Sequence, residues 1–303
     1  MMANSTSSTN SSFIGSLKKV MSRSNPGETD SQQCSSRRLP TFLDSKSLTS
    51  KLVSSKSPSN INVPSQDLMF SNIPFEEVAK ACNGFITSHK IGEGTFGEVY
   101  KGKRNNQDIA VKKTSRDKLS APNIELSEIF FDTYLSELKV LHGYPARNIL
   151  PLLAISFSED MSFDPCLIYE HMPNGSLDDR LQMKNGTPPL TWSQRAIIAK
   201  GTARGLSHLH ANNIIHQDIK SANILLDRHF EPKIGDLGLA RGGSNDPSVS
   251  YRTITRIQGT SWYLPDDYMR SFQLHPSIDT FCYGITLFDL VTGKRTCIYR
   301  HFC

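Results

Sequence analysis

The spacing of hydrophobic positions changes near residue 75. In residues 1–60 the large apolar residues follow no period, and 23 positions are Ser or Thr. Such a segment buries too little apolar surface to offset the entropy lost on ordering, so we predict a disordered Ser/Thr-rich tail over residues 1–70. Two interpretations of the tail stay open. It is either a phosphorylated regulatory segment, with Ser57-Pro58 as one candidate site, or a solvated leader without a specific role.

Alternating apolar runs follow from Phe75 onward. A short amphipathic helix is predicted at residues 75–81, with Gly84 as its end signal. After it, period-two patterning predicts strands. The runs that carry this pattern are residues 90–92, 98–101 and 109–112, and residues 166–169 form a further short, buried strand.

Two later segments repeat their apolar residues at helical spacing. Residues 128–142 predict one helix, and a longer helix is predicted from about Trp192 to His210. Trp192 and Trp262 are predicted to be packing residues. Strands followed by helices indicate an α+β fold, in which a small β-rich lobe joins a larger helical lobe. The core stripe of the longer helix is predicted at Ile197, Ala203, Leu206 and Leu209.

Composition and charge narrow the class of protein and the kinds of partner it could bind. The 303 residues are 37% hydrophobic and 21% charged, which suits a globular protein with a polar appendage. The formal charge of +5 comes from the tail, because residues 1–60 hold eight Lys/Arg and three Asp/Glu, and the remainder is neutral. A nucleic-acid-binding domain is expected to carry its basic stripe on the folded part. We therefore expect no nucleic-acid partner.

Cysteine usage and hydropathy bear on the compartment. The six cysteines include no CxxC pair and no metal-ligand spacing. Unpaired cysteines in a chain without a secretory signal fit a reducing cytosol. No uninterrupted apolar run approaches the ~18 residues that a membrane helix needs. We expect a cytoplasmic protein that does not insert into a membrane.

A glycine-rich segment, GEGTFG, occupies residues 92–97. In a dinucleotide-binding unit such glycines lie between a strand and a helix. Here a strand follows at residues 98–101, so we expect a hairpin whose backbone lies over phosphate oxygens. Glycine suits that role because it has no Cβ to block the approach. Taken alone, the segment is also compatible with an ordinary β-turn.

Lys112 ends the apolar strand at residues 109–112. We expect its ammonium group to lie below the hairpin and to hold the α- and β-phosphates of a nucleotide. A buried ammonium needs a partner, and Glu137 on the predicted helix is the best candidate. Glu125 and Glu128 compete for this role, and the alternative for Glu137 is a solvated surface carboxylate.

The strongest chemical signal is HQDIKSANILL at residues 216–226. Phosphoryl transfer needs a group that orients and deprotonates the attacking hydroxyl, positive charge near the γ-phosphate, and metal ligands. Asp218, Lys220 and Asn223 fill these roles in that order within one loop. Asp236, which begins a DLG triplet, is predicted to join Asn223 as a ligand of Mg²⁺, a cation that prefers oxygen ligands.

The glycine-rich loop, strand lysine, catalytic loop and metal-binding aspartate occur in the order and spacing of eukaryotic protein kinases, which this chain resembles. The lysine at position 220 resembles the residue that the serine/threonine subgroup has at this place in the catalytic loop. More narrowly, residues from about 75 to 296 resemble the interleukin-1-receptor-associated kinase and Pelle family. The segments that carry this resemblance are Tyr169 with residues 172–177, residues 187–192, 201–205 and 233–236, and residues 259–265, which are similar to insect Pelle.

The resemblance implies a bilobal protein kinase domain over residues 75–303 that uses ATP and Mg²⁺. Its N-lobe would span about 75–168 and its C-lobe about 172–303, ending early, after the central helix. Catalysis would fall to Asp218 and Lys220. The nucleotide site that the resemblance implies consists of Ile91, Gly92, Gly94, Gly97, Val99, Ala110, Lys112, Glu137, Tyr169, Glu170, Met172 and Leu225, with Asn223 and Asp236 as metal ligands.

Several roles follow from the resemblance alone. Tyr169 would guard the back of the adenine pocket, and the backbone of Glu170 and Met172 would hydrogen-bond the adenine. Thr260 would contact the catalytic loop, and Asp279 would anchor that loop from a helix below it. His216 is expected to brace the loop and not to titrate in catalysis.

The chain also departs from the family pattern. Gln217 replaces an arginine that pairs with a phosphorylated activation loop, so we expect that switch to be weakened, although Ser248, Ser250, Thr253 or Thr255 remain candidate phosphorylation sites. Leu237 replaces a phenylalanine, with little expected effect. Asp266 stands in place of a glutamate whose arginine partner lies beyond Cys303.

The family's later helices and its N-terminal death domain are not represented in the sequence. Without the later helices, we expect one face of the helical lobe to be exposed.

The sequence favours an ATP-dependent protein serine/threonine kinase with protein substrates. By family resemblance it would act in Toll-type and interleukin-1-type receptor signalling and join a receptor–adaptor complex. An inactive or weak kinase-fold scaffold or decoy is the alternative, motivated by the early end. A small-molecule kinase is disfavoured, because the segment that ends in Gly259-Thr260 is typical of a peptide-docking surface.

Overall fold

The computed structural model describes residues 71–94, 97–115, 124–157, 163–244, 246 and 248–295, with the side chains of 124–131 excepted. The described residues form two compact units. The first contains residues 71–131 and 152–169, and the second contains residues 132–151 and those from 170 onward. The predicted tail and the last eight residues lie outside the described residues.

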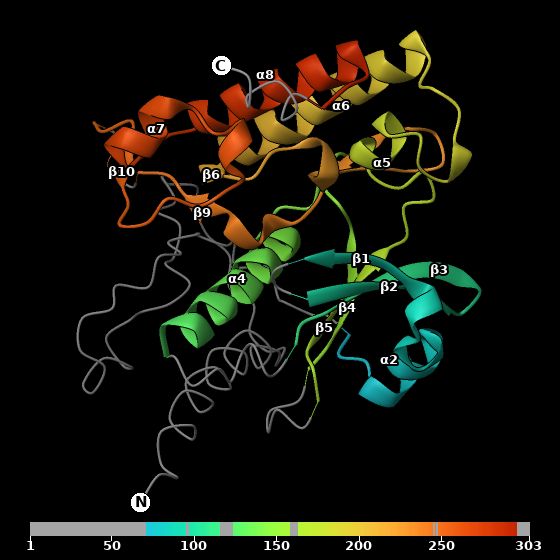
Figure 1. Ribbon diagram of the computed structural model, residues 1–303. Helices are drawn as coiled ribbons and strands as arrows, with labels where there is room; N and C mark the ends of the chain where they lie inside the picture. The colour runs from blue at the N-terminus through green and yellow to red at the C-terminus, as the bar shows by residue number, and fades with distance from the viewer. Residues whose placement is uncertain are drawn as a thin grey trace, which may run out of the picture. The chain divides into compact units, whose positions relative to one another are not determined.

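A five-stranded sheet forms the centre of the first unit, with strand order β1-β2-β3-β5-β4 (Figure 1). The β1–β2, β2–β3 and β4–β5 pairs are antiparallel. Residues just before α2 extend the β4 edge, because Asn72 forms a parallel bridge with Ile155. The strands are β1 Lys90–Gly94, β2 Gly97–Arg104, β3 Gln107–Lys113, β4 Leu152–Ser156 and β5 Cys166–Glu170.

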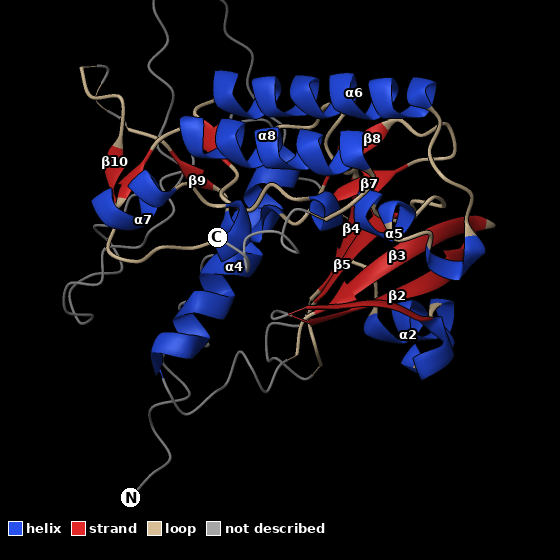
Figure 2. Ribbon diagram, turned by 45° about the horizontal axis from the view of Figure 1, so that its top comes forward, coloured by secondary structure: helices blue, strands red, loops and turns tan. Residues whose placement is uncertain are grey.

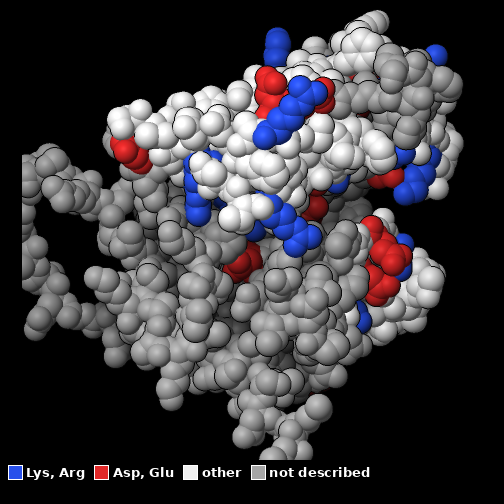
Figure 3. Space-filling model, turned by 60° about the vertical axis from the view of Figure 1, so that its left-hand side comes forward, with Lys and Arg blue, Asp and Glu red and all other residues white. Residues whose placement is uncertain are grey.

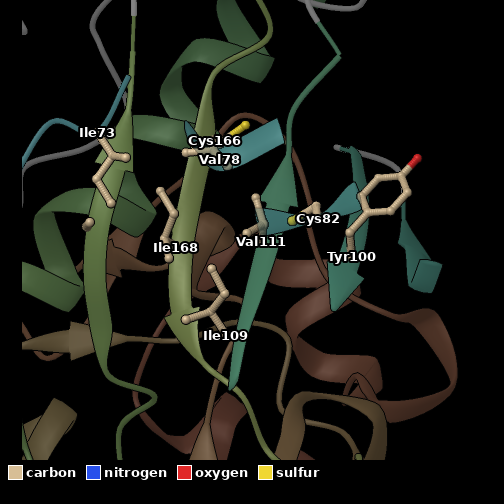
Figure 4. Packing of buried hydrophobic residues seen from close by; sticks show 9 residues of the cluster. Ile73, Val78, Cys82, Tyr100, Ile109, Val111, Cys166 and Ile168 are labelled. Atoms are coloured by element: carbon tan, nitrogen blue, oxygen red, sulfur yellow. The ribbon is translucent and has the colours of Figure 1, made fainter. Parts of the chain in front are cut away.

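One face of this sheet packs against α2 (Phe75–Ala81) and forms the core of the first unit. Val78 and Cys82 lie against Val111 and Cys166 in Figure 4. Tyr100 pairs with Val111 and belongs to the same cluster. Because side chains alternate across a strand, the neighbours of these residues lie on the opposite face of the sheet.

Helices dominate the second unit. Helix α4 begins in the first unit and continues into the second. Small two-stranded sheets pair β6 with β9, β7 with β8 and β10 with β11. The α-helices are α4 Ile124–Gly143, α5 Leu177–Leu181, α6 Trp192–Ala211, α7 Asp266–Ser271 and α8 Ser277–Thr292. The strands are β6 Ile214–Ile215, β7 Ile224–Leu226, β8 Pro232–Ile234, β9 Arg241–Gly242, β10 Arg252–Thr253 and β11 Gln273–Leu274.

Short 3-10 helices complete the described elements. They are η2 Asn83–Phe85, η3 Thr87–His89, η4 Lys184–Gly186, η5 Ser221–Asn223, η6 Leu237–Leu239 and η7 Ser261–Tyr263. The sheet-based first unit and the helical second unit confirm the predicted α+β fold.

Helix α6 starts where the sequence predicts, but its buried face differs from the prediction. A capping box begins it: the Thr191 hydroxyl accepts the Gln194 backbone N–H, and the Gln194 side chain accepts that of Thr191. Ile197 and Ala203 are exposed, so two of the four predicted core positions are wrong. The buried residues are Ile198, Gly201, Thr202, Gly205, Leu206 and Leu209.

Close backbone packing explains the shifted face. A Cβ at Gly205 would lie 2.7 Å from Ile234 Cδ1 and 2.8 Å from the Asn148 carbonyl oxygen. At Gly201 a Cβ would overlap the ring of Pro232. Strand β8 therefore approaches the helix backbone at these two glycines, and the larger apolar residues Ile197 and Ala203 turn away from it.

Helix α8 lies beside α6, as Figure 2 shows. It buries Ile278, Cys282 and Leu290 but exposes Phe281, Phe288 and Val291, so one face carries exposed apolar side chains. Trp192 and Trp262 are also exposed, by 70% and 44%, and the prediction that they are packing residues is wrong. Among the described helices, none is both long and apolar enough to cross a membrane.

Candidate active site

The loop between β6 and β7 holds the predicted catalytic residues, and Asp279 of α8 fixes its backbone. The Asp279 carboxylate accepts the backbone N–H of His216 through Oδ2 at 2.8 Å and that of Gln217 through Oδ1 at 2.8 Å. Asp279 is fully buried. A buried carboxylate that bridges two consecutive amides holds the loop firmly, which confirms the anchoring role expected for Asp279.

His216 braces the same loop from inside. Its Nδ1 accepts the backbone N–H of Asp218 at 3.2 Å, and its Nε2 lies 3.1 Å from the carbonyl oxygen of Gly235. Since Nδ1 accepts a hydrogen bond, Nε2 carries the proton and donates it to Gly235. The imidazole therefore links the catalytic loop to the residue just before Asp236.

Four donors converge on the Asp218 carboxylate. Oδ1 accepts the backbone N–H of Thr260 at 3.0 Å and its hydroxyl at 2.6 Å. Oδ2 accepts Lys220 Nζ at 2.7 Å and Asn223 Nδ2 at 3.0 Å. Lys220 Nζ also donates to the Thr260 hydroxyl at 2.9 Å. The structure thus brings together Asp218, Lys220 and Asn223, and adds Thr260 from the segment before α7.

Asn223 and Asp236 supply oxygen atoms that suit a hard cation. The Asn223 amide donates to both the carbonyl oxygen and the carboxylate of Asp218, so its own oxygen faces away from them. The backbone N–H of Gly235 donates to the backbone carbonyl oxygen of Asn223 at 2.9 Å. This hydrogen bond ties the residue before Asp236 to the catalytic loop. An amide oxygen and a carboxylate are ligand types that Mg²⁺ prefers. The chemistry of the two side chains therefore fits the predicted metal, and their role as its ligands stays a prediction.

Asp236 adopts a left-handed backbone conformation, with φ 57° and ψ 58°. Few non-glycine residues adopt this conformation without a local reason, and aspartate is among those that tolerate it. The turn passes directly into η6, where Leu237 and Gly238 are buried. The backbone conformation thus orients Asp236 differently from the buried residues that follow it.

Glu137 lies on α4 close to this turn. It is 2% exposed, and a Cβ placed on Gly238 would lie 3.7 Å from its Oε2. The alternative of a solvated surface carboxylate is wrong for Glu137. Its predicted pairing with Lys112 stays a prediction, because the two residues belong to different units. The competing candidates Glu125 and Glu128 have side chains outside the described part of the chain.

The sheet face opposite the α2 core carries some of the nucleotide-site residues predicted in the first unit. Val99 pairs with Lys112 across β2 and β3, and Ala110 pairs with Lys101. All four alternate with core residues, so they share the face that α2 does not cover. Tyr169 alternates in the same way with Ile168, a member of the α2-side cluster.

The glycines of the predicted phosphate loop have different local environments. A Cβ on Gly94 would meet no atom of the described residues within 4 Å, whereas a Cβ on Gly97 would overlap the carbonyl oxygen of Lys113 in β3. Gly97 is therefore required by the approach of two strands. Gly92 pairs with Val99, and Ile91 is 46% exposed. The loop tip at residues 95–96 lies outside the described residues.

The remaining predicted nucleotide residues lie in the second unit. Glu170 donates its backbone N–H to the Pro151 carbonyl oxygen at 3.2 Å, and the Met172 carbonyl oxygen accepts Gly175 N–H at 3.0 Å. Met172 is buried, and Leu225 is half-buried in β7. The adenine contacts expected of Glu170 and Met172 remain predictions.

A buried network behind the catalytic loop was missed by sequence reasoning. The Ser221 hydroxyl donates to Asp178 Oδ1 at 3.3 Å and lies 3.2 Å from the Tyr263 hydroxyl. Tyr263 in turn donates to Asp289 Oδ2 at 2.7 Å, and burial raises the pKa of this phenol. Arg295 also pairs with the Asp178 carboxylate. Because these partners lie 26–117 residues apart, no local pattern in the sequence predicts their contacts.

Gln217 occupies a buried position directly before Asp218 in the catalytic loop. Its amide nitrogen donates to the Leu239 carbonyl oxygen, and its amide oxygen accepts the Tyr268 hydroxyl at 3.3 Å. It is 1% exposed and adopts a positive φ of 70°. Gln217 thus ties the catalytic loop to the segment after Asp236 with a neutral side chain.

The combined arrangement is suited to moving a phosphoryl group. Asp218 offers a carboxylate whose orientation is fixed by four donors, and Lys220 places a cation next to it. Asn223 and Asp236 offer oxygen atoms for a metal. Positioning and electrostatic stabilisation are the main requirements of phosphoryl transfer, and this loop provides both.

Comparison with known proteins agrees with this geometry. The family described as "Protein kinase domain" matches residues 85–301, which is more than half of the chain. The chain is 39% identical over 231 residues to the Pelle-like serine/threonine-protein kinase pik-1 of Caenorhabditis elegans, covering 74% of this chain and 47% of that protein.

Two other relatives show similar identity. The serine/threonine-protein kinase pelle of Drosophila melanogaster is 37% identical over 229 residues, covering 74% of this chain and 44% of that protein. The probable serine/threonine-protein kinase PBL21 of Arabidopsis thaliana is 38% identical over 228 residues, covering 73% and 56%. The chain thus spans about half the length of these relatives.

Proposed function

The chain belongs to the protein kinase family, and from this membership we propose that it transfers the γ-phosphate of ATP to serine and threonine hydroxyls of proteins. One observation carries the proposal: Lys220, Asn223 and Thr260 all donate to the carboxylate of Asp218. The relatives pik-1, pelle and PBL21 are named serine/threonine-protein kinases, which supports the choice of hydroxyl.

Each residue of the loop has a role in this proposal. Asp218 orients the attacking hydroxyl and accepts its proton. Lys220, held between Asp218 and Thr260, stabilises the charge that develops on the transferred phosphoryl group. Asp279 and His216 do not react. They hold the loop in the conformation that the reaction needs.

The cofactors of the proposed reaction are ATP and Mg²⁺. Asn223 and Asp236 would hold the metal, which when bound neutralises phosphate charge. Lys112 and Glu137 would position the phosphates. Ile91, Gly92, Gly94, Gly97, Val99, Ala110, Tyr169, Glu170, Met172 and Leu225 complete the proposed nucleotide site.

The cellular setting belongs to the same proposal. Similarity to Pelle-like kinases supports a role in Toll-type and interleukin-1-type receptor signalling, with a receptor–adaptor complex as partner. A cytoplasmic location fits the buried cysteines Cys82, Cys166 and Cys282, which form no disulfide within the described part of the chain. Protein substrates are the direct partners.

The test is phosphoryl transfer to a degenerate peptide library that contains Ser, Thr and Tyr, followed by phosphoamino-acid analysis. The full chain is incubated with γ-labelled ATP and Mg²⁺. We expect label on Ser and Thr that depends on Mg²⁺. Label on Tyr alone would contradict the proposed specificity, and transfer no faster than in a protein-free control would favour the scaffold or decoy function.

A further inference from the structure

Helix α5 carries a buried carboxylate close to the catalytic loop. Asp178 lies in the first turn of this helix and is 7% exposed. The neighbouring Asp179 serves the capping box, because its carboxylate accepts the backbone N–H of Ser176 at 3.1 Å. Asp178 is not part of that box. Aspartate is rarely buried this far unless it is paired, so the partners of Asp178 indicate its role.

Arg295, from the segment after α8, pairs with this carboxylate. Its Nε donates to Asp178 Oδ1 and its Nη2 donates to Asp178 Oδ2, so the guanidinium contacts both carboxylate oxygens. Two such contacts fix the plane of the carboxylate as well as its position. Gly293 ends α8 in the left-handed conformation, with φ 70°. Leu177 of α5 and Leu290 of α8 belong to one hydrophobic cluster, so the ion pair joins two elements that already pack together.

Ser221 connects the ion pair to the catalytic loop. Its hydroxyl donates to Asp178 Oδ1 at 3.3 Å, which is the same oxygen that Arg295 Nε contacts. Ser221 is 2% exposed and directly follows Lys220, whose Nζ donates to the catalytic carboxylate at 2.7 Å. Arg295 thus reaches the catalytic loop through a single shared oxygen atom.

The 3-10 turn η5 relates the position of Ser221 to the orientation of Asn223. The turn spans these two residues, and the backbone N–H of Asn223 donates to the Lys220 carbonyl oxygen at 3.0 Å. The Asn223 amide donates to the backbone carbonyl oxygen of Asp218 at 2.8 Å and to its carboxylate at 3.0 Å. A rotation of η5 would therefore change both the contact with Asp218 and the direction of the Asn223 amide oxygen.

The burial of the Asp178–Arg295 pair favours positioning over stabilisation. The two side chains are 10% and 39% exposed. At the surface that Figure 3 shows, Lys/Arg and Asp/Glu side chains gather in some of the same places, where water screens their attraction. For a buried pair, the cost of removing the charges from water offsets much of the attraction, so the net gain in stability is small. The bidentate geometry still fixes the direction of the groups that the pair contacts.

We propose that Arg295 is a positioning residue for phosphoryl transfer: it fixes the Asp178 carboxylate, which holds Ser221 and thereby orients Asn223 within η5. The inference rests on the proposed function, in which the Asn223 amide oxygen faces the metal. Arg295 and Asp178 are not catalytic residues, since both act through Ser221. Their contribution is the orientation of Asn223, whose contacts with Asp218 keep the loop in one arrangement.

The experiment compares Arg295→Met, Ser221→Ala and the double variant in the full chain. Arg295→Lys keeps the charge but cannot contact both carboxylate oxygens in the same way. Lys184→Gln is the matched control, because Lys184 is 57% exposed and pairs with Asp179 of the same helix at 2.9 Å.

Two quantities are measured for each protein. The first is the position of the Asn223 side-chain amide signals in the ¹⁵N–¹H NMR spectrum, which are assigned by their loss in Asn223→Ala. The second is the pair of steady-state constants, kcat and the KM for ATP. The NMR signals report the orientation of Asn223 whether or not phosphate is transferred.

We expect Arg295→Met to shift the Asn223 amide signals and to lower kcat about tenfold, the value of one charge-assisted hydrogen bond, while the KM for ATP stays close to that of the wild type. Ser221→Ala should do the same. The double variant should lose no more kcat than either single variant, because both changes break one connection. Arg295→Lys should recover part of the loss, and Lys184→Gln should match the wild type in both measurements.

Unchanged Asn223 signals in Arg295→Met would overturn the inference, even if that variant melts at a lower temperature, because its role would then be structural only. A double variant whose kcat falls by the product of the two single losses would also overturn it, since Arg295 would act independently of Ser221. If Arg295→Met does not fold, the signals in Arg295→Lys and Ser221→Ala decide, and wild-type positions in both overturn the inference. A wild type without phosphoryl transfer would contradict the proposed function, whereas the NMR comparison would still decide whether Arg295 orients Asn223.

Discussion

Asp218 is held by side chains that come from three separate segments of the chain. Lys220 and Asn223 approach from its own loop, Thr260 from the segment before α7, and Asp279 fixes the backbone from α8. Each carboxylate oxygen receives two donors. Removing one donor therefore changes the orientation of the reacting group as well as its charge balance.

Thr260→Val tests this dependence at a single residue. The change removes the hydroxyl that donates to Asp218 at 2.6 Å and accepts from Lys220 at 2.9 Å. Because a hydrogen bond to a charged group is lost, we expect the turnover number to fall by about ten- to a hundredfold. The thermal midpoint should change little, since Thr260 is only partly buried. Steady-state kinetics and calorimetry measure the two effects.

Thr260→Ser is the control, because serine keeps the hydroxyl. It should retain most of the wild-type turnover. If the Val and Ser variants lose activity equally, the hydroxyl does not position Asp218, because serine keeps that hydroxyl and valine does not.

At the scale of elements, the sequence predicts more of the sheet than of the helix packing. Strands β1, β2, β3 and β5 lie where period-two patterning indicates, and the start of α6 coincides with its capping residue. The buried face of α6 was not predictable from hydrophobicity, because the contact with β8 requires glycine. Periodicity identifies apolar positions, but it does not reveal where two backbones approach closely.

In the catalytic loop, too, the sequence predicts local features but not contacts between distant residues. Residues 216–226 could be recognised because their spacing is local, and Asp236 follows at a fixed distance. The network of Ser221, Tyr263 and Asp289 joins residues that are 26 and 42 positions apart, so only the folded structure brings them together.

The close packing of α6 gives a prediction at this scale. An alanine in a helix interior is normally more stable than glycine by about 1 kcal/mol. At Gly205 we expect the opposite, a loss of about 1–3 kcal/mol in the free energy of unfolding, because the new Cβ would be forced against Ile234 and Asn148. Chemical denaturation of Gly205→Ala measures this change.

Gly284→Ala in α8 is the matched helical control. Apart from its chain neighbours and the backbone of its own helix, no described residue has an atom within 4 Å of a Cβ at Gly284. This substitution should therefore stabilise the protein by up to about 1 kcal/mol. Opposite signs for the two variants are the expected outcome, and stabilisation by both would show that β8 does not approach α6 as closely as described.

At the scale of the molecule, formal charge and acid stability depend on different regions. The excess of positive charge comes from residues 1–60, whereas the remainder is neutral. Within the second unit, Glu231 connects distant segments: its carboxylate accepts Asn148 Nδ2 at 2.8 Å and Arg204 Nη2 at 2.8 Å, and it pairs with Arg147. This carboxylate, just before β8, joins α6 to the loop after α4.

Glu231 should contribute to stability above the pKa of an unfolded glutamate. Partial burial works against ionisation, but the Asn148 hydrogen bond and the charges of Arg147 and Arg204 lower the pKa of Glu231 in the folded state. A group with a lowered folded pKa stabilises the protein at higher pH, and this contribution is lost as the pH falls through that pKa. Acidification below about 4.5 should therefore reduce stability.

Glu231→Gln tests this pH dependence. Thermal midpoints measured from pH 7 to pH 3 should fall less steeply below pH 4.5 for the variant than for the wild type, because one carboxylate no longer takes up a proton. Parallel curves would mean that Glu231 makes no contribution to acid stability.

The proposed phosphoryl transfer depends on Asp218. It is tested by the initial rate of γ-phosphate transfer to protein Ser/Thr by the wild type and by Asp218→Asn, at saturating ATP and Mg²⁺. Asparagine keeps the shape but cannot accept the proton, so the rate should fall by about 10²–10⁴ while the ATP affinity stays close to that of the wild type. Equal rates for the two proteins would contradict the account.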